Sequence, residues 1–288
     1  MLQITREKLE EVLDFPSLIP VLENSFVEKI AVPARHHHEF PNPVEGGAST
    51  LLLMPAWESG RYLGVKVVTV CPHNGKYELP AVQGMYLLFD AHKGTPLAQV
   101  EAQMLTALRT AAASALAARF LARSDSHRLL MIGTGALAPH LIRAHATVRP
   151  VRQVFVWGRR FQRAAAVADS LAATTALHVE PVRTIEEVIR EADIISCATL
   201  SARPLILGDQ LRAGQHLDLV GSFKPNMREA DDEVIRRASI FVDSRHTAPR
   251  ECGDLAIPIR RRILSVGAIK ADLFELCAGR HPGRKRHE

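Results

Sequence analysis

Gly133, Gly135 and Ala138 form a G-x-G-x-x-A pattern between an apolar run and a helix-like segment. In such a turn the first glycine permits a tight bend, the second lets a ligand approach the backbone, and a small third residue lets the helix pack on the strand. The helix start also offers free N–H groups to phosphate. The pattern predicts a turn that holds the pyrophosphate of a dinucleotide, with a plain structural turn as the alternative. The expected lining residues are Gly133, Thr134, Gly135, Ala136, Leu137 and Ala138.

The second apolar run of this region, at 153–158, indicates which dinucleotide is bound. An NAD-binding domain usually carries Asp or Glu at the end of its second strand, where the carboxylate binds the ribose 2′-hydroxyl. Here no acidic residue occurs between positions 126 and 168, and arginines follow the run instead. Guanidinium groups match a 2′-phosphate, so we predict NADP(H) with a lower preference for NAD(H). A solvated helix start is the alternative. The residues concerned are Trp157, Gly158, Arg159, Arg160 and Arg163.

Two further apolar runs end at Thr199 and Gly221. In a doubly wound sheet, ligands bind outside the carboxyl ends of the strands. We therefore expect both residues to line the same crevice as the glycine turn. The remaining residues expected at the cofactor are Thr110, Ala198, Val220 and Ser222.

The elements that must position these residues fall into two groups. Before position 125, charged segments at 6–13 and 17–29 predict helices, and runs at 49–57, 62–72 and 81–100 predict antiparallel hairpin strands. A long Ala- and Leu-rich helix follows at 101–125.

From 126 onward, short apolar runs alternate with amphipathic segments, which is typical of βαβ units in a doubly wound parallel sheet. We predict an α/β protein whose Rossmann domain covers 125–258. The expected strands are 128–133, 153–158, 177–182, 193–199, 216–222 and 239–244, and the expected helices are 136–148, 160–174, 184–192 and 228–238.

The composition excludes several classes of function. Of 288 residues 47% are hydrophobic, no apolar run approaches the roughly 20 residues of a membrane span, and the charged N-terminus lacks a secretion signal, so we expect a cytoplasmic protein. The four cysteines form no C-x-x-C pair, and adjacent His36, His37 and His38 point in different directions, so no metal site is predicted. The net charge of +5 is spread out and only 5% of residues are aromatic, which argues against nucleic acid.

Several motifs resemble the ornithine cyclodeaminase/mu-crystallin family in order over nearly the whole chain: "MPAW", "GVKVVTVCPHN", "LLFDAHKGTPLA", "LTALRTAAASALAARFLA", "IGTGALA", "LVGSFKP" and "READDE". The resemblance implies a Rossmann domain joined to an α+β domain that binds the substrate and forms a homodimer. It places this second domain at 1–124, with 259–288 returning towards it. Members include ornithine cyclodeaminase, an archaeal type of alanine dehydrogenase and reductases of cyclic imino acids.

The resemblance also assigns residues to the substrate carboxylate. Arg35 matches an arginine of a P-x-R stretch, Lys66 the lysine of "GVK", and Arg109 the arginine of "TALRTAA". Two guanidinium forks and an ammonium suit one carboxylate. Arg109 stands in an apolar stretch, so we expect it to be buried and to need an anionic partner. Asn74 is a further candidate for the substrate pocket, although Asn-Gly is first of all a turn signal.

Phe223 separates two branches of the family. Cyclodeaminases carry an aspartate at the matching position, and a phenyl ring cannot transfer a proton. The resemblance therefore implies the reductase branch, in which NADPH reduces Δ1-pyrroline-2-carboxylate to L-proline and Δ1-piperideine-2-carboxylate to L-pipecolate. The alternatives are an ornithine cyclodeaminase, an amino-acid dehydrogenase, or an NADPH-binding protein without turnover. The binding-protein alternative rests on the expectation that family members continue with a further segment after the position that matches Glu288.

Overall fold

The computed structural model describes residues 1–285, and the chain divides into two compact units. Unit 1 comprises Met1–Ser17 and Glu28–Arg109, and unit 2 comprises Leu18–Val27 and the chain from Thr110 onward. This division falls inside the long helix, after Arg109, and not at the predicted boundary of 124/125. It also places the segment after 258 in unit 2, with residues 125–258. The functional roles expected for the two domains stay predictions.

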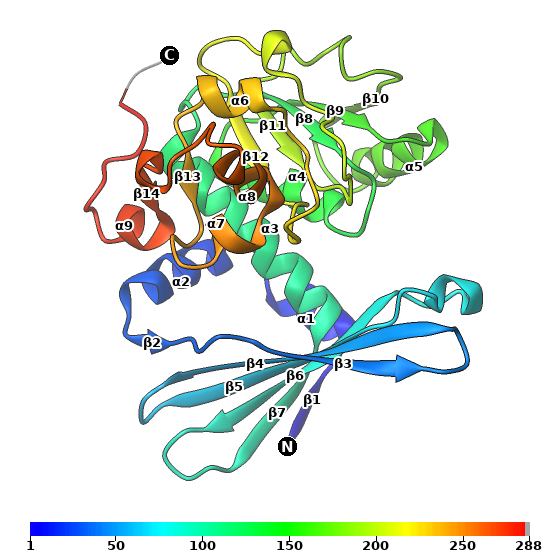
Figure 1. The fold of residues 1–288 in the computed structure, drawn as a ribbon, viewed down its shortest axis with the longest axis vertical. Helices are drawn as coiled ribbons and strands as arrows, with labels where there is room; N and C mark the ends of the chain where they lie inside the picture. The colour runs from blue at the N-terminus through cyan, green and yellow to red at the C-terminus, as the bar shows by residue number, and fades with distance from the viewer. Residues whose placement is uncertain (286–288) are drawn as a thin grey trace. The chain divides into compact units, whose positions relative to one another are not determined.

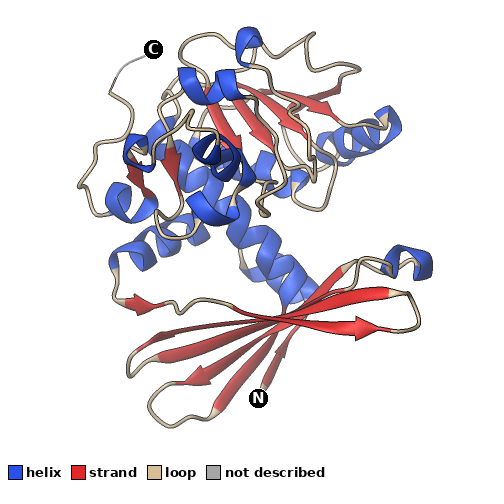
Figure 2. Cartoon of the chain, in the orientation of Figure 1, coloured by secondary structure: helices blue, strands red, loops and turns tan. Residues whose placement is uncertain are grey.

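Unit 1 contains a seven-stranded sheet, shown in red in the lower part of Figure 2. Its order is β1-β7-β6-β5-β4-β2, and β3 also pairs with β4. Neighbours from β4 to β7 are antiparallel, which confirms the predicted hairpins, whereas β1 runs parallel to β7. The strands are β1 (Leu2–Ile4), β2 (Ile30–Ala31), β3 (His36–Asn42), β4 (Gly47–Glu58), β5 (Tyr62–Val70), β6 (Val82–Asp90) and β7 (Pro96–Glu101).

The first three helices begin at polar side chains that accept free backbone N–H groups. Thr5 caps α1 (Arg6–Val12), and the Asp14 carboxylate accepts the N–H of Ser17 at 2.8 Å near the start of α2 (Phe15–Val27). Glu101 accepts the N–H of Met104 at 2.7 Å and so starts α3 (Ala102–Leu121). Within residues 1–285, no helix has the length and apolar character needed to cross a bilayer.

Unit 2 is built on five parallel strands in the order β10-β9-β8-β11-β12. The chain moves outward from β8 through β9 to β10, then returns to the other side of β8, which is the doubly wound arrangement. This confirms the predicted α/β fold class. Helices α4 (Ala138–Val148) and α5 (Phe161–Ala172) pack along the sheet (Figure 1). The strands are β8 (Arg128–Ile132), β9 (Gln153–Trp157), β10 (His178–Pro181), β11 (Ile194–Cys197) and β12 (His216–Leu219).

The predicted helix at 184–192 is wrong, because this segment is a series of turns. Its N–H groups alternate between acceptors three and four residues back: Val188 and Ile189 both donate to the Ile185 carbonyl. Ile185, Val188 and Ile189 are nevertheless buried and cover one face of the sheet, together with Leu130 and Phe155. The apolar spacing therefore reports burial against the sheet without a regular helix.

The predicted strand at 239–244 is also wrong as a member of the main sheet. β13 (Phe241–Val242) pairs instead with β14 (Ala271–Asp272) in a separate two-stranded sheet. A small core of Ile235, Leu255 and Leu264 holds this region together. The surrounding elements are α6 (Asp232–Arg237), α7 (Ala248–Glu251), α8 (Gly253–Arg260) and α9 (Leu273–Cys277), with 3₁₀ turns η1 (Asn74–Tyr77), η2 (Gly208–Gln210) and η3 (Val266–Ala268) elsewhere in the chain.

The carboxyl end of α3 is satisfied by two arginines from distant segments. Arg149 donates to the carbonyls of Ala118, Arg119 and Ala122, each at 2.8 Å. Arg284 donates through its backbone N–H to the Phe120 carbonyl and through its side chain to the Leu121 carbonyl. Cations at a helix C-terminus also interact favourably with the helix dipole. These bonds fasten the last described segment to α3.

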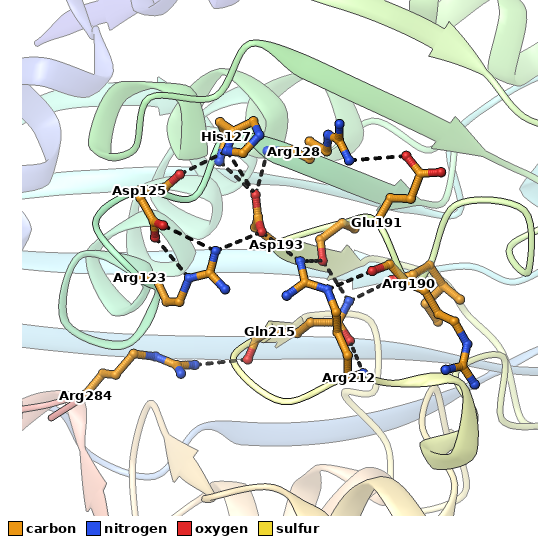
Figure 3. A network of polar contacts seen from close by, with 12 residues as sticks. Arg123, Asp125, His127, Arg128, Arg190, Glu191, Asp193, Arg212, Gln215 and Arg284 are labelled. Carbon is orange, nitrogen blue, oxygen red and sulfur yellow. Dashed lines mark hydrogen bonds and ion pairs between the residues drawn. The ribbon is translucent and has the colours of Figure 1, made fainter. Parts of the chain in front are cut away.

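The amino ends of the unit 2 strands meet at Asp193 (Figure 3). This carboxylate, 3% exposed, accepts the N–H groups of His127 and Arg128 at 3.0 and 3.1 Å. Its other oxygen accepts from Arg123 at 3.2 Å and from Arg212 at 2.8 Å. Although burial favours the neutral acid, these donors hold the pKa of Asp193 below its usual value. Asp193 thereby fixes the start of β8 relative to β11.

We predict that Asp193→Ala lowers the free energy of unfolding by about 3 kcal/mol, because two backbone N–H groups lose their carboxylate acceptor and two partly buried guanidinium groups each lose one of their acceptors. Denaturant unfolding at neutral pH measures the change. The matched control is Glu191→Gln: Glu191 forms an exposed ion pair with Arg128 in the same region, and its loss should cost no more than about 0.5 kcal/mol. Equal effects of the two substitutions would contradict this account of Asp193.

Candidate active site

The glycine turn connects the carboxyl ends of three strands. Gly133 has a φ of +122°, and a Cβ there would lie 2.6 Å from the Ala198 carbonyl oxygen just after β11. The N–H of Gly133 donates to the Trp157 carbonyl at the end of β9, at 2.9 Å. Both the conformation and the close approach require glycine at this position.

Gly135 is different, because nothing in the fold demands a glycine there. A Cβ would meet no atom within 4 Å, and its φ lies outside the left-handed region. Gly135 and Ala136 are exposed, whereas Ala138 is 1% exposed where α4 begins against the sheet. The first turn of α4 contains no acidic residue. The turn leaves open space at Gly135, and a helix start in general offers N–H groups to a pyrophosphate, which supports the predicted role of the turn.

Arginines surround the end of β9, as the sequence predicts. Arg159 and Arg160 are exposed, Arg160 directly precedes α5, and exposed Arg163 lies in the first turn of α5. That turn has no acidic residue. Three cations at a helix N-terminus oppose the helix dipole, so helix stability does not explain them. An anion bound at this corner would explain the three arginines.

A fourth cation at this corner, Arg183, was not predicted from the sequence. Its guanidinium group lies 4.6 Å from the centre of the Phe161 ring, a cation–π contact. The Trp157 indole N–H donates to the Arg183 carbonyl at 3.2 Å. Phe161 directly follows the pair Arg159 and Arg160. An aromatic ring next to these cations was the only sign in the sequence that a further cation could pack here.

The expected residues after β11 and β12 come together beside the glycine turn. Ala198 donates its N–H to the Ile132 carbonyl at 2.9 Å, and Val220 donates to the Cys197 carbonyl at 2.8 Å. A Cβ on Gly221 would lie 2.0 Å from the Thr199 carbonyl oxygen, so the two loops touch. These loops bring Ala198, Thr199, Val220 and Gly221 to one end of the sheet.

Ser222 is the exception among the predicted residues. It is 5% exposed, and its hydroxyl donates to the Met227 carbonyl at 2.9 Å and accepts the Asp254 N–H at 3.2 Å. The hydroxyl therefore serves the protein interior. Phe223, the next residue, is 55% exposed and provides an apolar surface beside Gly221.

Glu229 is a fully buried acid that the sequence did not single out. One carboxylate oxygen accepts the N–H of Thr199 at 2.7 Å and its hydroxyl at 2.8 Å, and the other accepts the N–H of Gly221 at 2.8 Å. Burial raises the pKa of Glu229 to about 7, outweighing these bonds and one from the Cys197 thiol. Glu229 lies within the acidic run "READDE", whose pattern gives no sign of this buried position.

In unit 1 the structure brings Lys66, Arg35 and Arg109 into electrostatic contact. The Lys66 ammonium donates to the Thr106 hydroxyl at 3.0 Å. Its pKa is lowered to about 8, first by burial and then by the charges of Arg109 and Arg35. Arg109 itself is exposed. The expectation that it is buried is therefore wrong, because Ala107, Leu108 and the following alanines take the buried face of α3.

Tyr86 lies beside this cluster and was also missed. It is the direct cross-strand partner of Lys66, so both side chains lie on the same face of the sheet. Its ring occupies the space over Gly64, where a Cβ would lie 1.7 Å from the Tyr86 hydroxyl oxygen. Burial raises the pKa of Tyr86. Gly64, in the "GVK" motif, is thus explained by the aromatic ring next to Lys66.

The remaining candidates in unit 1 have local roles or exposed positions. The Asn74 amide donates to the Pro80 carbonyl at 2.9 Å and so holds its own turn, η1. His36, His37 and His38 lie exposed on β3. Within residues 1–285, no three His, Cys, Asp or Glu side chains gather as a metal site. Thr110, on α3, is half-buried and belongs to unit 2.

Comparisons with known proteins find similarity over most of the chain. Residues 2–288 match the model of the ornithine cyclodeaminase/mu-crystallin family. A Δ1-pyrroline-2-carboxylate reductase from Paracoccus denitrificans is 39% identical over 240 residues, which cover 83% of this chain and 75% of the relative.

Two solved structures extend the comparison to three dimensions. Thermococcus litoralis Δ1-pyrroline-2-carboxylate reductase, in complex with NADH and L-proline, superposes with a TM-score of 0.93 at 32% identity, covering 100% of this chain and 90% of that one. A dimeric archaeal alanine dehydrogenase with bound NAD superposes with a TM-score of 0.90 at 27% identity, covering 100% and 88%.

The two glycines of the turn should respond differently to one added methyl group. Gly135→Ala should leave the melting temperature unchanged, because the Cβ meets no protein atom. It should weaken dinucleotide binding at least about tenfold, or 1.4 kcal/mol, by keeping the pyrophosphate away from the backbone. Gly133→Ala should instead lower the melting temperature. Calorimetry and fluorescence titration with NADPH test the pair, and a Gly135→Ala protein that binds NADPH normally would refute the assignment.

Proposed function

The chain belongs to the ornithine cyclodeaminase/mu-crystallin family, and we propose that it reduces the C=N bond of cyclic imino acids. The substrates are Δ1-pyrroline-2-carboxylate, reduced to L-proline, and Δ1-piperideine-2-carboxylate, reduced to L-pipecolate. Two of the relatives described above are named Δ1-pyrroline-2-carboxylate reductases. Within this chain, the observation that carries the proposal is the cluster of Lys66, Arg35 and Arg109.

This cluster is suited to a carboxylate. Burial and two neighbouring guanidinium charges all disfavour the Lys66 ammonium. A bound anion would offset all three effects at once. Its negative charge attracts each cation and gives the Lys66 ammonium the stabilisation that water gives an exposed one. The two guanidinium groups can each offer paired N–H donors, and Lys66 adds a point charge. We assign the substrate carboxylate to these three residues.

Holding the carboxylate fixes the position of the imine carbon, which is bonded directly to the carboxylate carbon. A bound nicotinamide supplies the hydride. The reduction would add the hydride to C2 of the ring, and the electrons of the C=N bond would move to nitrogen, which already carries a proton in the iminium form. Charge therefore balances without a dedicated acid, and Lys66 acts through orientation.

Phe223 favours this reaction over ornithine cyclisation. The side chain is largely exposed and has no titratable atom, so it cannot take or give a proton. An ornithine cyclodeaminase would need a proton-transferring group that this position lacks.

For the cofactor we propose NADPH ahead of NADH. The two solved relatives hold NADH and NAD, so a nicotinamide dinucleotide is common to them. Arg159 and Arg160, with Arg163 and Arg183 nearby, present positive charge where an NAD-binding domain usually presents an acid. We also propose that the protein works as a cytoplasmic homodimer, as the archaeal alanine dehydrogenase is a dimer.

The direct test of this function is NADPH oxidation on addition of Δ1-pyrroline-2-carboxylate to the purified protein, followed by absorbance. Oxidation that depends on the imine, with L-proline as product, is the expected result. L-Ornithine in a parallel reaction should release no ammonia. Tight NADPH binding without any oxidation would overturn the reductase proposal in favour of a binding protein.

The pKa of Lys66 predicts how carboxylate binding depends on pH. At pH 7 Lys66 is charged, and above about pH 8 it loses its proton. A bound carboxylate stabilises the ammonium, so binding takes up a proton above pH 8 and affinity falls by up to about tenfold per pH unit. Pyrrole-2-carboxylate, which lacks a basic nitrogen, is the ligand for calorimetric titration at pH 7 and 9.

Lys66→Met should bind pyrrole-2-carboxylate weakly at both pH values and lose the pH dependence. Lys93→Met, at an exposed lysine in the turn between β6 and β7, is the matched control and should behave like the wild type. Full pH dependence in Lys66→Met would assign the titration to another group.

The arginines after β9 should decide the cofactor preference. Arg159→Asp combined with Arg160→Ser should weaken NADPH at least about 100-fold, because two cations at the 2′-phosphate are lost, while NADH changes little. Arg152→Ser, an exposed arginine just before β9, controls for the loss of positive charge. An unchanged ratio of the NADPH and NADH dissociation constants would place the 2′-phosphate elsewhere.

A further inference from the structure

The strand order of unit 2 divides the cofactor crevice into two halves. Arg159 and Arg160 follow β9, on one side of the glycine turn, and are assigned to the adenosine half of the dinucleotide. A dinucleotide extends across the carboxyl ends of the strands in such a sheet. The nicotinamide half therefore belongs to the other side, at the ends of β11 and β12.

Glu229 links these two strand ends. The same carboxylate binds Thr199, just after β11, and Gly221, just after β12. The packing is tight, because a Cβ on Gly221 would lie 2.5 Å from the Glu229 carboxylate oxygen. The carboxylate thus sets both the spacing of the two loops and the direction of their N–H groups.

Glu229 is itself held from behind. The Asp254 carboxylate accepts the N–H groups of Glu229 and Ala230 at 3.0 and 2.9 Å, and Asp254 is 2% exposed. The buried Arg228 side chain donates to the Ala230 carbonyl at 2.7 Å and also pairs with Asp232. These bonds leave the Glu229 backbone little freedom.

Burying this acid is costly for the fold. The hydrogen-bond partners of the Glu229 carboxylate are neutral: two backbone N–H groups, the Thr199 hydroxyl and the Cys197 thiol. A buried carboxylate without a paired cation is unfavourable compared with a neutral residue. The cost becomes understandable if both loops must keep one geometry for a ligand.

We propose that Glu229 is a positioning residue for the nicotinamide half of the cofactor, acting by tying the loops after β11 and β12 into one rigid surface. This inference rests on the dinucleotide assignment within the proposed function. It assigns Glu229 no contact with substrate and no proton transfer. The adenosine half, bound on the other side of the glycine turn, does not depend on it.

The test compares a whole cofactor with half of one. Glu229→Gln replaces one of the two acceptor oxygens by an NH₂ group, which is a donor. Either Thr199 or Gly221 therefore loses its hydrogen bond. The dissociation constant of NADPH should rise at least tenfold, whereas that of adenosine 2′,5′-bisphosphate, which lacks the nicotinamide half, should stay within twofold. Thr199→Val removes one hydrogen bond to the same carboxylate. We expect it to raise the dissociation constant of NADPH by less than Glu229→Gln does, and this measurement tests the proposal even if Glu229→Gln fails to fold.

Glu187→Gln, at an exposed glutamate of unit 2, is the matched control and should bind both ligands like the wild type. Equal weakening of both ligands by Glu229→Gln would make Glu229 a general structural residue, and no weakening of either would remove it from cofactor binding; both results overturn the proposal. These titrations contain no imino acid. If the protein binds NADPH but shows no turnover, the reductase function is refuted and the test of Glu229 still applies.

Discussion

The close approach of two backbones, at Gly133 and Ala198, is the constraint on which the cofactor site depends. Only a residue without a Cβ fits against the Ala198 carbonyl there, and only glycine takes that φ readily. The contact joins the ends of β8 and β11, where the strand order reverses. It therefore fixes the turn, the start of α4 and the edge of the crevice together. The contacts of Gly221 with Thr199 and Glu229 extend the same close packing to β12.

In the proposed function the two units recognise different groups by different physical means. Unit 2 offers backbone N–H groups, a helix start and glycines that let a ligand approach closely, together with the exposed arginines after β9. Unit 1 offers side-chain charge, with a half-buried lysine between the fields of two arginines. Backbone recognition suits the constant parts of a dinucleotide, and concentrated positive charge suits a small carboxylate. The chemistry of an imino-acid reductase needs both.

Sequence patterns predicted those parts of the structure that are governed by local periodicity. Alternating apolar runs gave the hairpins of unit 1 and five of the six strands expected in unit 2, and the glycine spacing gave the turn. The predictions that failed concern features that tertiary packing decides and local periodicity does not. Residues 184–192 bury a helical pattern without forming a helix. β13 pairs with β14, a strand 30 residues further along the chain that no local pattern connects to it. Arg109 is exposed because neighbouring alanines fill the packed face of α3.

The residues that the sequence missed are those whose role depends on partners far away in the chain. Glu229 acts on Thr199 and Gly221, Asp193 on the start of β8, and Arg183 on Phe161. An acidic or basic residue in a polar run gives no local sign of such a partner. Glycines are more informative, because the absence of a side chain already records a close contact.

The central claim is hydride transfer to the imine carbon, and isotope transfer tests it most directly. Δ1-Pyrroline-2-carboxylate would be incubated with the protein and NADPH deuterated at C4 of the nicotinamide on each face in turn, and the proline analysed by mass spectrometry and NMR. The account predicts one deuterium at C2 of L-proline from one face of the cofactor alone. Proline without deuterium from either face, or no proline formed at all, would contradict it.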